Sequence, residues 1–507
     1  MNNTEFFSCF ETTMNEVVKL VRSATRTIYY STFICSVTHQ LPGQPAGVTL
    51  KQLFTDALAR GVSIFILYNP STSYGNIQAG QFLAELTPQT TRPHNQGIEN
   101  NVTTGELQLK TVTGSGQLGP LATFVSSHKF YSNHHQKYLC VDGKRILVTG
   151  CDISAERNGW LKLNSMGYYW HEFSVSAPCT AEMYTYIQSN FHDGICTTPA
   201  PLPLTASGTH NSEHAIILDM IKNCKEFMHI EAQTCTSTQF TKNTIFTAII
   251  QRVKQAYHHK ELDPFKCLVL TNDKMIGETA LVRWASEQDV MWSRRYLKAG
   301  LESIGVPWNF VCDRVFMGKL QHNNINIKIH SNVFIQDGNV LLRTSSNLND
   351  RSFSNKPCDT ELGILVTGPE VSRFQSLQLA RYLGKPFETS ADFFVALQAT
   401  THAPQVDSAC LIKPIRLSAT KEERTRVPNS IVNYIMKTTH KGNFHGGIDV
   451  IVWTLTKIKT KKEVVLFKYT KPLVMVCTLF LILAVVAFIY KRRQIGNSSF
   501  LLTKTQS

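Results

Sequence analysis

Apolar and polar positions follow two periods along the chain, and their order predicts alternating helices and strands. Near the start, four apolar residues have the i, i+3, i+4, i+7 spacing of one helix face: Val17, Leu20, Val21 and Ala24. A β-like run, TIYYSTFI, follows at 27–34. Residues 50–70, LKQLFTDALARGVSIFILYNP, then have the pattern of a helix, a glycine turn and a buried strand. This alternation predicts an α/β fold in which helices cover the sheets.

The same order of elements returns 200 residues later. A second helix face carries apolar residues at the matching positions: Ile217, Met220, Ile221 and Cys224. A β-like run, FMHIEAQT, follows at 227–234, and residues 245–273 repeat the order of helix and buried strand. Two such halves in tandem indicate an internal duplication.

The last part of the chain carries a long apolar run between basic clusters. Residues 473–490, LVMVCTLFLILAVVAFIY, include no charge, and at ~1.5 Å per residue such a helix crosses most of a ~30 Å hydrocarbon layer. Residues 457–493 hold nine basic residues and one acid, so they supply +8 of the formal net charge of +14. A buried core helix is the alternative, but the basic flanks favour one transmembrane helix.

The placement of the charge also bears on partners and topology. A net charge of +14 suits nucleic acid or an anionic membrane, but the surplus lies beside the apolar run and not across the folded part. Nucleic acid is therefore the less favoured partner, and anionic headgroups the more favoured one. The N-terminus, MNNTEFFSCFETTMNEVV, has no signal-peptide pattern, so we expect a single-pass, C-terminally anchored protein with its folded part in the cytosol.

A segment rich in Pro, Ser, Thr and Gly, TTPAPLPLTASGT, separates the two halves. We therefore predict six segments: a first half at 1–196, a linker at 197–209, a second half at 210–390, a connector with the basic juxtamembrane segment at 391–471, the transmembrane helix at 472–490 and a short tail at 491–507.

Each half contains a histidine that precedes an apolar, strand-like run ending in aspartate. In the first half, HHQKYLCVD places His135, Lys137 and Asp142 on one stretch. In the second half, IHSNVFIQD places His330 and Asp337 at the same interval of seven residues. One such match is weak evidence, but the recurrence in the same strand context predicts that the two copies serve one site.

Five motifs together resemble the phospholipase D superfamily with its duplicated HKD motif, and more narrowly the eukaryotic-type catalytic core. They cover roughly residues 10–390: HHQK with GCDIS, YYWHEF at 168–173, CKEFMHIEAQ, SSNLNDRSF and DTELGILV. The resemblance implies two tandem α/β/α sandwich halves related by a pseudo-twofold axis, which form one site within one chain. It implies no metal and no cofactor.

The resemblance also implies roles for the site residues. One histidine attacks phosphorus and forms a phosphohistidine, and the other protonates the leaving alcohol. Because its half keeps Lys137, His135 is the expected nucleophile and His330 the expected acid. Carboxylates on the other ring nitrogens would come from Glu172 and Glu361. The remaining residues expected to bind or orient phosphate are Asp152, Ser345 and Asn347, while Asp142 and Asp337 are expected to orient loops.

The second motif departs from the family pattern, because Asn332 stands where the family has lysine. Loss of a buried cation beside a developing phosphorane costs ~2–4 kcal/mol, or about 10²–10³ in rate. In NIKIHSN, residues two apart share one face of a strand, so Lys328 could reach the same phosphate from one step upstream. A solvated lysine at a strand end is the slightly favoured alternative for Lys328.

These observations predict a membrane-anchored phosphodiesterase of phospholipase D type. It would act on phospholipid headgroup esters, with water or an alcohol as acceptor. Two alternatives stay open at this point. One is a catalytically weakened protein that remodels or scaffolds membranes, which Asn332 favours, and the other is a nuclease-type member acting on single strands.

Overall fold

The structure is a computed structural model in which most of the first 415 residues are placed. It describes residues 3–33, 36–68, 99–102, 105–111, 134–150, 152, 161–164, 167–192, 198–207, 212–235, 244–259, 263–273, 280–353, 359–402 and 409–415. The chain divides into two units, Met1–Val450 and Ile451–Ser507, and every described residue belongs to the first. The predicted transmembrane helix at 472–490 and its basic flanks lie outside the described residues. Within the described ranges, no helix has both the length and the apolar character to cross a membrane.

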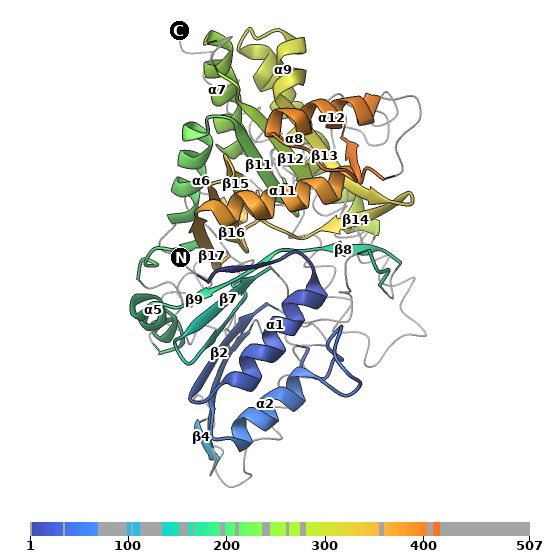
Figure 1. Cartoon of the computed structure of the whole chain (residues 1–507). Coiled ribbons are helices and arrows are strands. Elements are labelled where there is room, and N and C mark those ends of the chain that lie inside the picture. Colours follow the sequence, from blue (N-terminus) through green and yellow to red (C-terminus); the bar gives the residue numbers. More distant parts are fainter. Residues whose placement is uncertain are drawn as a thin grey trace, which may run out of the picture. The chain divides into compact units, whose positions relative to one another are not determined.

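The first sheet has eight strands in the order β1-β9-β7-β6-β2-β3-β5-β4. Their bounds are β1 (Glu5–Phe7), β2 (Thr27–Thr32), β3 (Ser63–Tyr68), β4 (Glu99–Val102), β5 (Gly105–Thr111), β6 (Tyr138–Val141), β7 (Arg145–Thr149) and β9 (Ser174–Pro178). Helices α1 (Phe10–Ser23) and α2 (Leu50–Ala59) lie side by side along one face of this sheet (Figure 1). Helix α5 (Ala181–His192) packs on the other face.

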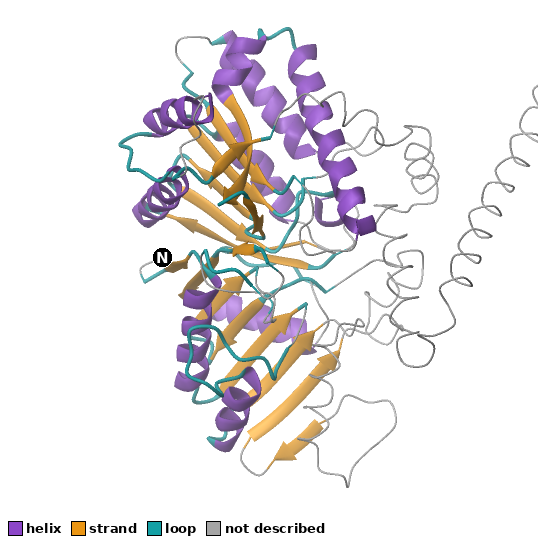
Figure 2. Cartoon of the chain, turned by 90° about the vertical axis from the view of Figure 1, so that its right-hand side faces the viewer, coloured by secondary structure: helices purple, strands orange, loops and turns teal. Residues whose placement is uncertain are grey.

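The second sheet has ten strands, nine of them in the order β10-β17-β16-β15-β11-β12-β13-β14-β8, with a tenth paired to β13. Their bounds are β8 (Tyr169–His171), β10 (Leu204–Ser207), β11 (Phe227–Ala232), β12 (Lys266–Thr271), β13 (Val315–His322), β14 (Ile325–Ile329), β15 (Val333–Gln336), β16 (Val340–Thr344), β17 (Glu361–Thr367) and the tenth strand, β18 (Ile412–Pro414). The helices of this part are α6 (Ser212–Asn223), α7 (Thr244–His258), α8 (Ala280–Ser303), α9 (Trp308–Arg314), α10 (Asp350–Phe353), α11 (Pro369–Leu383) and α12 (Ser390–His402). Figure 2 shows helices on both sides of these strands.

The centres of the two sheets have the same strand order and the same relative directions. In the first sheet, β2 is parallel to β3 and antiparallel to β6, and the run continues antiparallel through β7 to β9. In the second sheet, β11 is parallel to β12 and antiparallel to β15, and the run continues antiparallel through β16 to β17. The two histidine-bearing stretches therefore lie at corresponding places, each just before the strand that pairs antiparallel with the central one.

Side chains of the central strands alternate between separate apolar cores, as strand geometry requires. In β2, Ile28 packs with α1 and α2, whereas Tyr29 lies in a core that contains residues of both sheets. In β11, Met228 packs with α6, α7, α8 and α9, whereas Phe227 lies in the shared core. Helices thus cover both faces of each sheet, as the alternation of apolar periods predicts.

Three strands from outside the predicted second half, 210–390, pair with the second sheet. The segment 197–209, predicted as a linker, contains β10, which pairs with β17 at the edge of the second sheet. The segment 391–471, predicted as a connector, begins with most of α12 and includes β18, which pairs with β13. Strand β8 comes from the first half of the chain but pairs with β14 of the second sheet. Short strands at sheet edges are hard to predict, because a single paired edge needs little apolar periodicity.

Candidate active site

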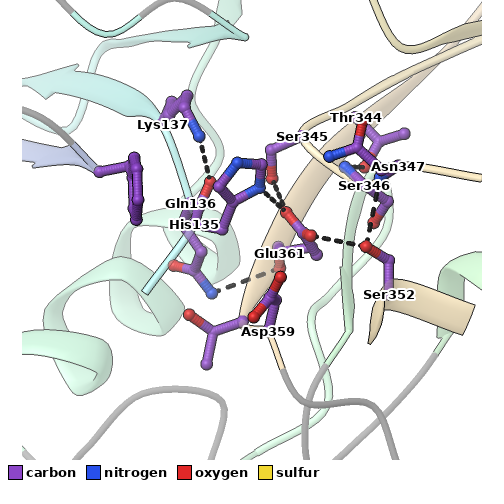
Figure 3. A network of polar contacts seen from close by, with 12 residues as sticks. His135, Gln136, Lys137, Thr344, Ser345, Ser346, Asn347, Ser352, Asp359 and Glu361 are labelled. Carbon is purple, nitrogen blue, oxygen red and sulfur yellow. Dashed lines mark hydrogen bonds and ion pairs between the residues drawn. The ribbon is translucent and has the colours of Figure 1, made fainter. Parts of the chain in front are cut away.

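The first predicted histidine is held by a carboxylate from the other half of the chain. A parallel bridge between His134 and Thr360 places the next residues, His135 and Glu361, side by side. The His135 Nδ1 atom lies 2.7 Å from Glu361 Oε2 (Figure 3). The backbone N–H of His135 also donates to the Thr360 carbonyl at 3.0 Å. The ring is thereby oriented with its second nitrogen, Nε2, directed away from the carboxylate.

Glu361 is fully buried and receives two hydroxyl donors besides the imidazole. Ser345 Oγ donates to Oε2 at 2.6 Å, and Ser352 Oγ donates to Oε1 at 2.8 Å (Figure 3). Burial alone would raise the pKa of Glu361, but the charges of His135 and Lys137 and the hydrogen bonds from His135 and Ser345 lower it to about 2. The carboxylate is therefore ionised at neutral pH.

The second predicted histidine is held in the same way, with the halves exchanged. The parallel pairing of β14 with β8 matches Ile329 with His171, so the next residues, His330 and Glu172, lie side by side. His330 Nδ1 lies 2.8 Å from Glu172 Oε2, and the backbone N–H of His330 donates to the His171 carbonyl at 2.9 Å. The ring of Trp170 lies against the imidazole of His330, with 4.8 Å between centroids.

Both predicted lysines are buried at the site. Lys137 is 1% exposed, and its ammonium donates to the main-chain carbonyl of His135 at 2.9 Å. Lys328 is 4% exposed, and its ammonium lies 5.1 Å from the ring centroid of Trp170, the ring that contacts His330. The slightly favoured expectation that Lys328 is a solvated strand-end lysine is therefore wrong. Aromatic faces stabilise the cation where water cannot.

The amide of Asn332 hydrogen-bonds to other residues of the protein, whereas a lysine at this place in the motif would be directed at the ligand. Its Oδ1 accepts from the backbone N–H of Gln233 at 3.0 Å, and its Nδ2 donates to the carbonyl of Ser345 at 3.2 Å. A longer contact of 3.5 Å joins Nδ2 to Asn347 Oδ1. The amide thus ties the end of β11 to the loop that carries Ser345, and it keeps that serine in place for Glu361.

The predicted aspartates organise the ends of the central strands. Asp142 accepts from the backbone N–H groups of Thr25, Arg26 and Thr27, and Asp337 accepts in the same way from residues 225–227. Burial opposes ionisation of both, but these hydrogen bonds lower the pKa of each carboxyl. Both have positive φ angles, 55° and 51°. These contacts fix the loops before β2 and β11.

Asp152 contacts the opposite end of β2. Its Oδ1 accepts from the hydroxyl of Thr32 and from the backbone N–H of Phe33, each at 2.8 Å. The ring of Phe33 lies 5.5 Å from that of His135, measured between centroids, so Asp152 fixes a residue that borders the first histidine.

Several buried polar residues around the site were not among the predicted site residues. His134 bridges the halves, with Nε2 2.7 Å from Ser31 Oγ and Nδ1 3.0 Å from Thr360 Oγ1. Burial lowers the pKa of His134 to about 3, so this ring is neutral. Under the site, His171, Glu231 and Tyr382 form a fully buried cluster. Its members are 60 to 211 residues apart in the chain, and no sequence period signals such a contact.

Two further buried charged residues, Arg343 and Glu213, were not predicted from the sequence. Arg343 is fully buried and its Nη2 donates to Glu172 Oε1 at 2.9 Å. Glu213 is fully buried and accepts hydroxyl hydrogen bonds from Thr205, Thr344 and Ser346. An arginine inside the apolar strand run VLLRT was the one available signal, because such a side chain must find a charged partner.

Among the residues that the structure describes, no group of three or more His, Cys, Asp or Glu side chains has the geometry to hold a metal ion. Each half of the candidate site has one imidazole, one buried carboxylate bonded to it and one buried ammonium group nearby, and such a set of groups can bind an anion and transfer protons.

Comparison with known proteins points to one superfamily. No protein-family model matches the chain. It is 27% identical to phospholipase D B of Dictyostelium discoideum over 232 residues, which is 40% of this chain and 18% of that protein. It is 27% identical to human phospholipase D1 over 194 residues, 34% of this chain and 18% of that protein. These matches span less than a fifth of each relative and support the resemblance to the phospholipase D superfamily.

Solved structures give more distant similarities. Phosphatidylserine synthase of Haemophilus influenzae aligns with a TM-score of 0.46 and 12% identity, over 74% of this chain and 84% of that one. Polyphosphate kinase of Porphyromonas gingivalis aligns with a TM-score of 0.42 and 7% identity, over 74% of this chain and 46% of that one. The duplication of the motif and the C-terminal anchor stay predictions.

The buried carboxyl of Glu213 predicts a pH-dependent loss of stability. Burial raises its pKa from 4.5 to about 7, against the effect of the hydroxyl donors. Between these two values the unfolded chain releases the proton while the folded chain keeps it, so stability falls as the pH rises and then levels off. Relative to Glu213→Gln, the wild-type free energy of unfolding should decrease by about 3 kcal/mol from pH 4 to pH 8.

Urea unfolding of the two proteins in detergent, followed by tryptophan fluorescence, measures this difference. Glu182→Gln is the matched control on an exposed helix turn. Hydrogen bonds from its own backbone N–H and from Thr180 lower the pKa of Glu182, so its pH-dependent difference should have the opposite sign. A Glu213→Gln difference that does not change with pH would contradict the prediction.

Proposed function

We propose that this protein is a membrane-anchored phosphodiesterase of phospholipase D type that acts on phospholipid headgroup esters. The observation that carries the proposal is the reciprocal pairing of two histidines with two buried carboxylates, His135 with Glu361 and His330 with Glu172. Each pair joins the two halves of the chain. Such a pair fixes the proton on Nδ1 and leaves Nε2 available for chemistry.

The proposed reaction has two displacement steps at phosphorus. In the first, the lone pair of His135 Nε2 forms an N–P bond while the bond between phosphorus and the headgroup oxygen breaks. That oxygen takes the proton from Nε2 of His330, so the alcohol leaves uncharged. In the second step, water or another alcohol attacks phosphorus, gives its proton to His330, and the N–P bond breaks. Both histidines then return to their first state, and the product is phosphatidic acid or a new phosphatidyl ester.

Two buried ammonium groups would stabilise the charge on the phosphoryl oxygens. Lys137 lies beside His135, and Lys328 lies over Trp170 beside His330, so each histidine has one cation near it. Lys328 thereby takes the role that the family assigns to the lysine absent at 332. Fixed cations in a site without water stabilise a phosphorane more strongly than cations in solvent do.

The substrate class and the overall symmetry rest on separate support. The matched relatives are named phospholipases D, and that name motivates a phospholipid substrate for this chain. The corresponding strand orders of the two sheets support an internal duplication with a pseudo-twofold axis between the histidines. Asn332 favours a second candidate, a protein of the same fold that has lost turnover and shapes membranes.

Alanine substitution of each histidine tests the proposed roles. His135→Ala should abolish measurable hydrolysis of phosphatidylcholine, because no N–P bond can form. His330→Ala should lower kcat about 10²–10⁴-fold, the usual contribution of a general acid. His259→Ala, at an exposed position beyond the end of α7, is the matched control and should retain full activity. Release of choline by the purified full chain is the measurement, and wild-type rates in His135→Ala would refute the proposal.

Substitutions of Lys328 and Asn332 test whether Lys328 compensates for the lysine that the second motif lacks. Lys328→Ala should lower kcat about 10²-fold or more, because it removes the buried ammonium that lies over Trp170 beside His330. Asn332→Lys should not raise kcat, because its amide holds Gln233 and Ser345 in place. The exposed Lys222→Ala on α6 controls for loss of net charge. A wild-type protein that is inert on every phosphodiester would favour the membrane-shaping candidate.

Membrane attachment is proposed from residues 473–490 and the basic residues on both sides. Protease added to sealed vesicles should digest the folded part, and the sequon at Asn101 should carry no glycan. Removal of residues 473–507 should release the protein from the membrane. Vesicles opened with detergent serve as the control for protease access. A protected, glycosylated folded part would reverse the proposed topology.

A further inference from the structure

The two carboxylates that hold the histidines have different partners. Besides His135, Glu361 receives the neutral hydroxyl groups of Ser345 and Ser352. Besides His330, Glu172 receives the guanidinium of Arg343, with Nη2 2.9 Å from Oε1. The corresponding strands and motifs are alike in the two halves, so this difference in charge is a departure from their symmetry.

The structure holds the guanidinium of Arg343 in one place. Its Nε donates to the Phe173 carbonyl at 2.7 Å, and its Nη1 donates to the Asn332 carbonyl at 2.9 Å and to that of Thr344. The side chain is fully buried, so it cannot turn toward solvent. Three main-chain carbonyls therefore direct the guanidinium at Glu172.

Space for the guanidinium depends on Gly150. A Cβ atom at this position would lie 2.0 Å from Arg343 Nη2 and 2.4 Å from Glu172 Oε1, far closer than atoms can approach. Arg343 lies 13 residues after His330. In the first half, the residue 13 places after His135 is Val148, which has no charge. The second half-site alone therefore has a cation at this position of the motif.

We propose that Arg343 is a positioning residue that divides the chemistry between the two histidines, by making His330 the acid and leaving His135 the nucleophile. This inference rests on the proposed function. An imidazolium beside a free carboxylate holds its proton tightly, whereas a carboxylate paired with guanidinium holds it less. His330 therefore gives its Nε2 proton more readily to the leaving oxygen. Glu361 is bonded to two neutral hydroxyl groups and interacts with the charge of Lys137 only at longer range, so it can stabilise the ring of His135 when that ring becomes cationic on N–P bond formation.

Other charged groups lie near His330, but each reaches its imidazole through an intervening residue, whereas Arg343 bonds to the carboxylate that holds it. Lys328 approaches through Trp170, which contacts the imidazole. The buried pair of Glu231 and His171 reaches this region through Ser331, the next residue after His330. In the first half-site, Lys137 donates to a main-chain carbonyl, whereas Arg343 donates to the carboxylate itself. Substitutions at 343 therefore change the charge beside Glu172, and Arg343→Lys, which keeps the charge, controls for the loss of the guanidinium hydrogen bonds to main-chain carbonyls.

The test compares two esters that differ only in the leaving group, phosphatidylcholine and phosphatidyl-p-nitrophenol, in mixed micelles with the full chain. Because p-nitrophenol leaves without an acid, Arg343→Met should lower kcat/KM roughly 10-fold more on phosphatidylcholine than on the nitrophenyl ester. The alkaline limb of the phosphatidylcholine profile should move up by about one pH unit. Arg343→Lys, which keeps the charge, should restore the wild-type ratio of the two substrates.

Two further variants separate this electrostatic role from a structural one. Gly150→Ala should show at least the substrate ratio of Arg343→Met, because its Cβ would separate the guanidinium from the Glu172 carboxylate while both groups are still present. Ser352→Ala removes a neutral donor from Glu361 and should lower both rates alike, with the alkaline limb unmoved. If Arg343→Met does not unfold cooperatively and so is not properly folded, the ratio of kcat/KM on the two esters in Gly150→Ala and Arg343→Lys tests the proposal instead.

Three results would overturn the inference. Equal loss on both esters in Arg343→Met or Gly150→Ala would show that Arg343 acts on the fold or on binding and not on the acid. A failure of Arg343→Lys to restore the ratio would show that charge is not the property required. A wild-type chain inert on both esters would remove the proposed function, and the inference with it.

Discussion

Two carboxylates without access to water, Glu172 and Glu361, are the constraint on which the rest of the structure depends. Removing such a charge from water costs several kcal/mol unless a charged partner and hydrogen bonds replace the solvent. Each carboxylate obtains its imidazole from the opposite half of the chain. The halves must therefore associate for both charges to be satisfied, and the same contacts create the candidate active site between them.

The backbone places these pairs by the same device on both sides. A parallel bridge from His134 to Thr360 sets His135 beside Glu361, and the register of Ile329 with His171 sets His330 beside Glu172. Each bridge fixes the residue that follows it in both strands. Strand β8 must leave the first half of the chain and join the second sheet to do this, which explains why the division of the sheets does not follow the division of the sequence.

Apolar periodicity predicted the α/β class, and the spacing of the two motifs predicted the candidate histidines, because both depend on local order in the chain. The carboxylates Glu172 and Glu361 were expected only from the resemblance to the phospholipase D superfamily. Contacts between distant segments were not predictable. Lys328 and its aromatic neighbours come together only through the pairing of β14 with β8. Arg343 finds Glu172 across 171 residues, and the edge strands β10 and β18 have too few residues to show a period. Their places follow from packing and from the need to compensate buried charge.

The most direct measurement of the central claim, that the two halves form one site for covalent catalysis, is the identification of the trapped intermediate. The full chain would be mixed with phosphatidylcholine labelled at phosphorus, quenched in alkali to preserve phosphohistidine, and mapped by mass spectrometry of its peptides. The account predicts a phosphatidyl group, or its deacylated glycerophosphoryl remnant, on His135, none on His330, and loss of the adduct in Glu361→Gln, which removes the carboxylate supplied by the other half. Turnover without any phosphohistidine, or an adduct on a residue outside this pair, would contradict it.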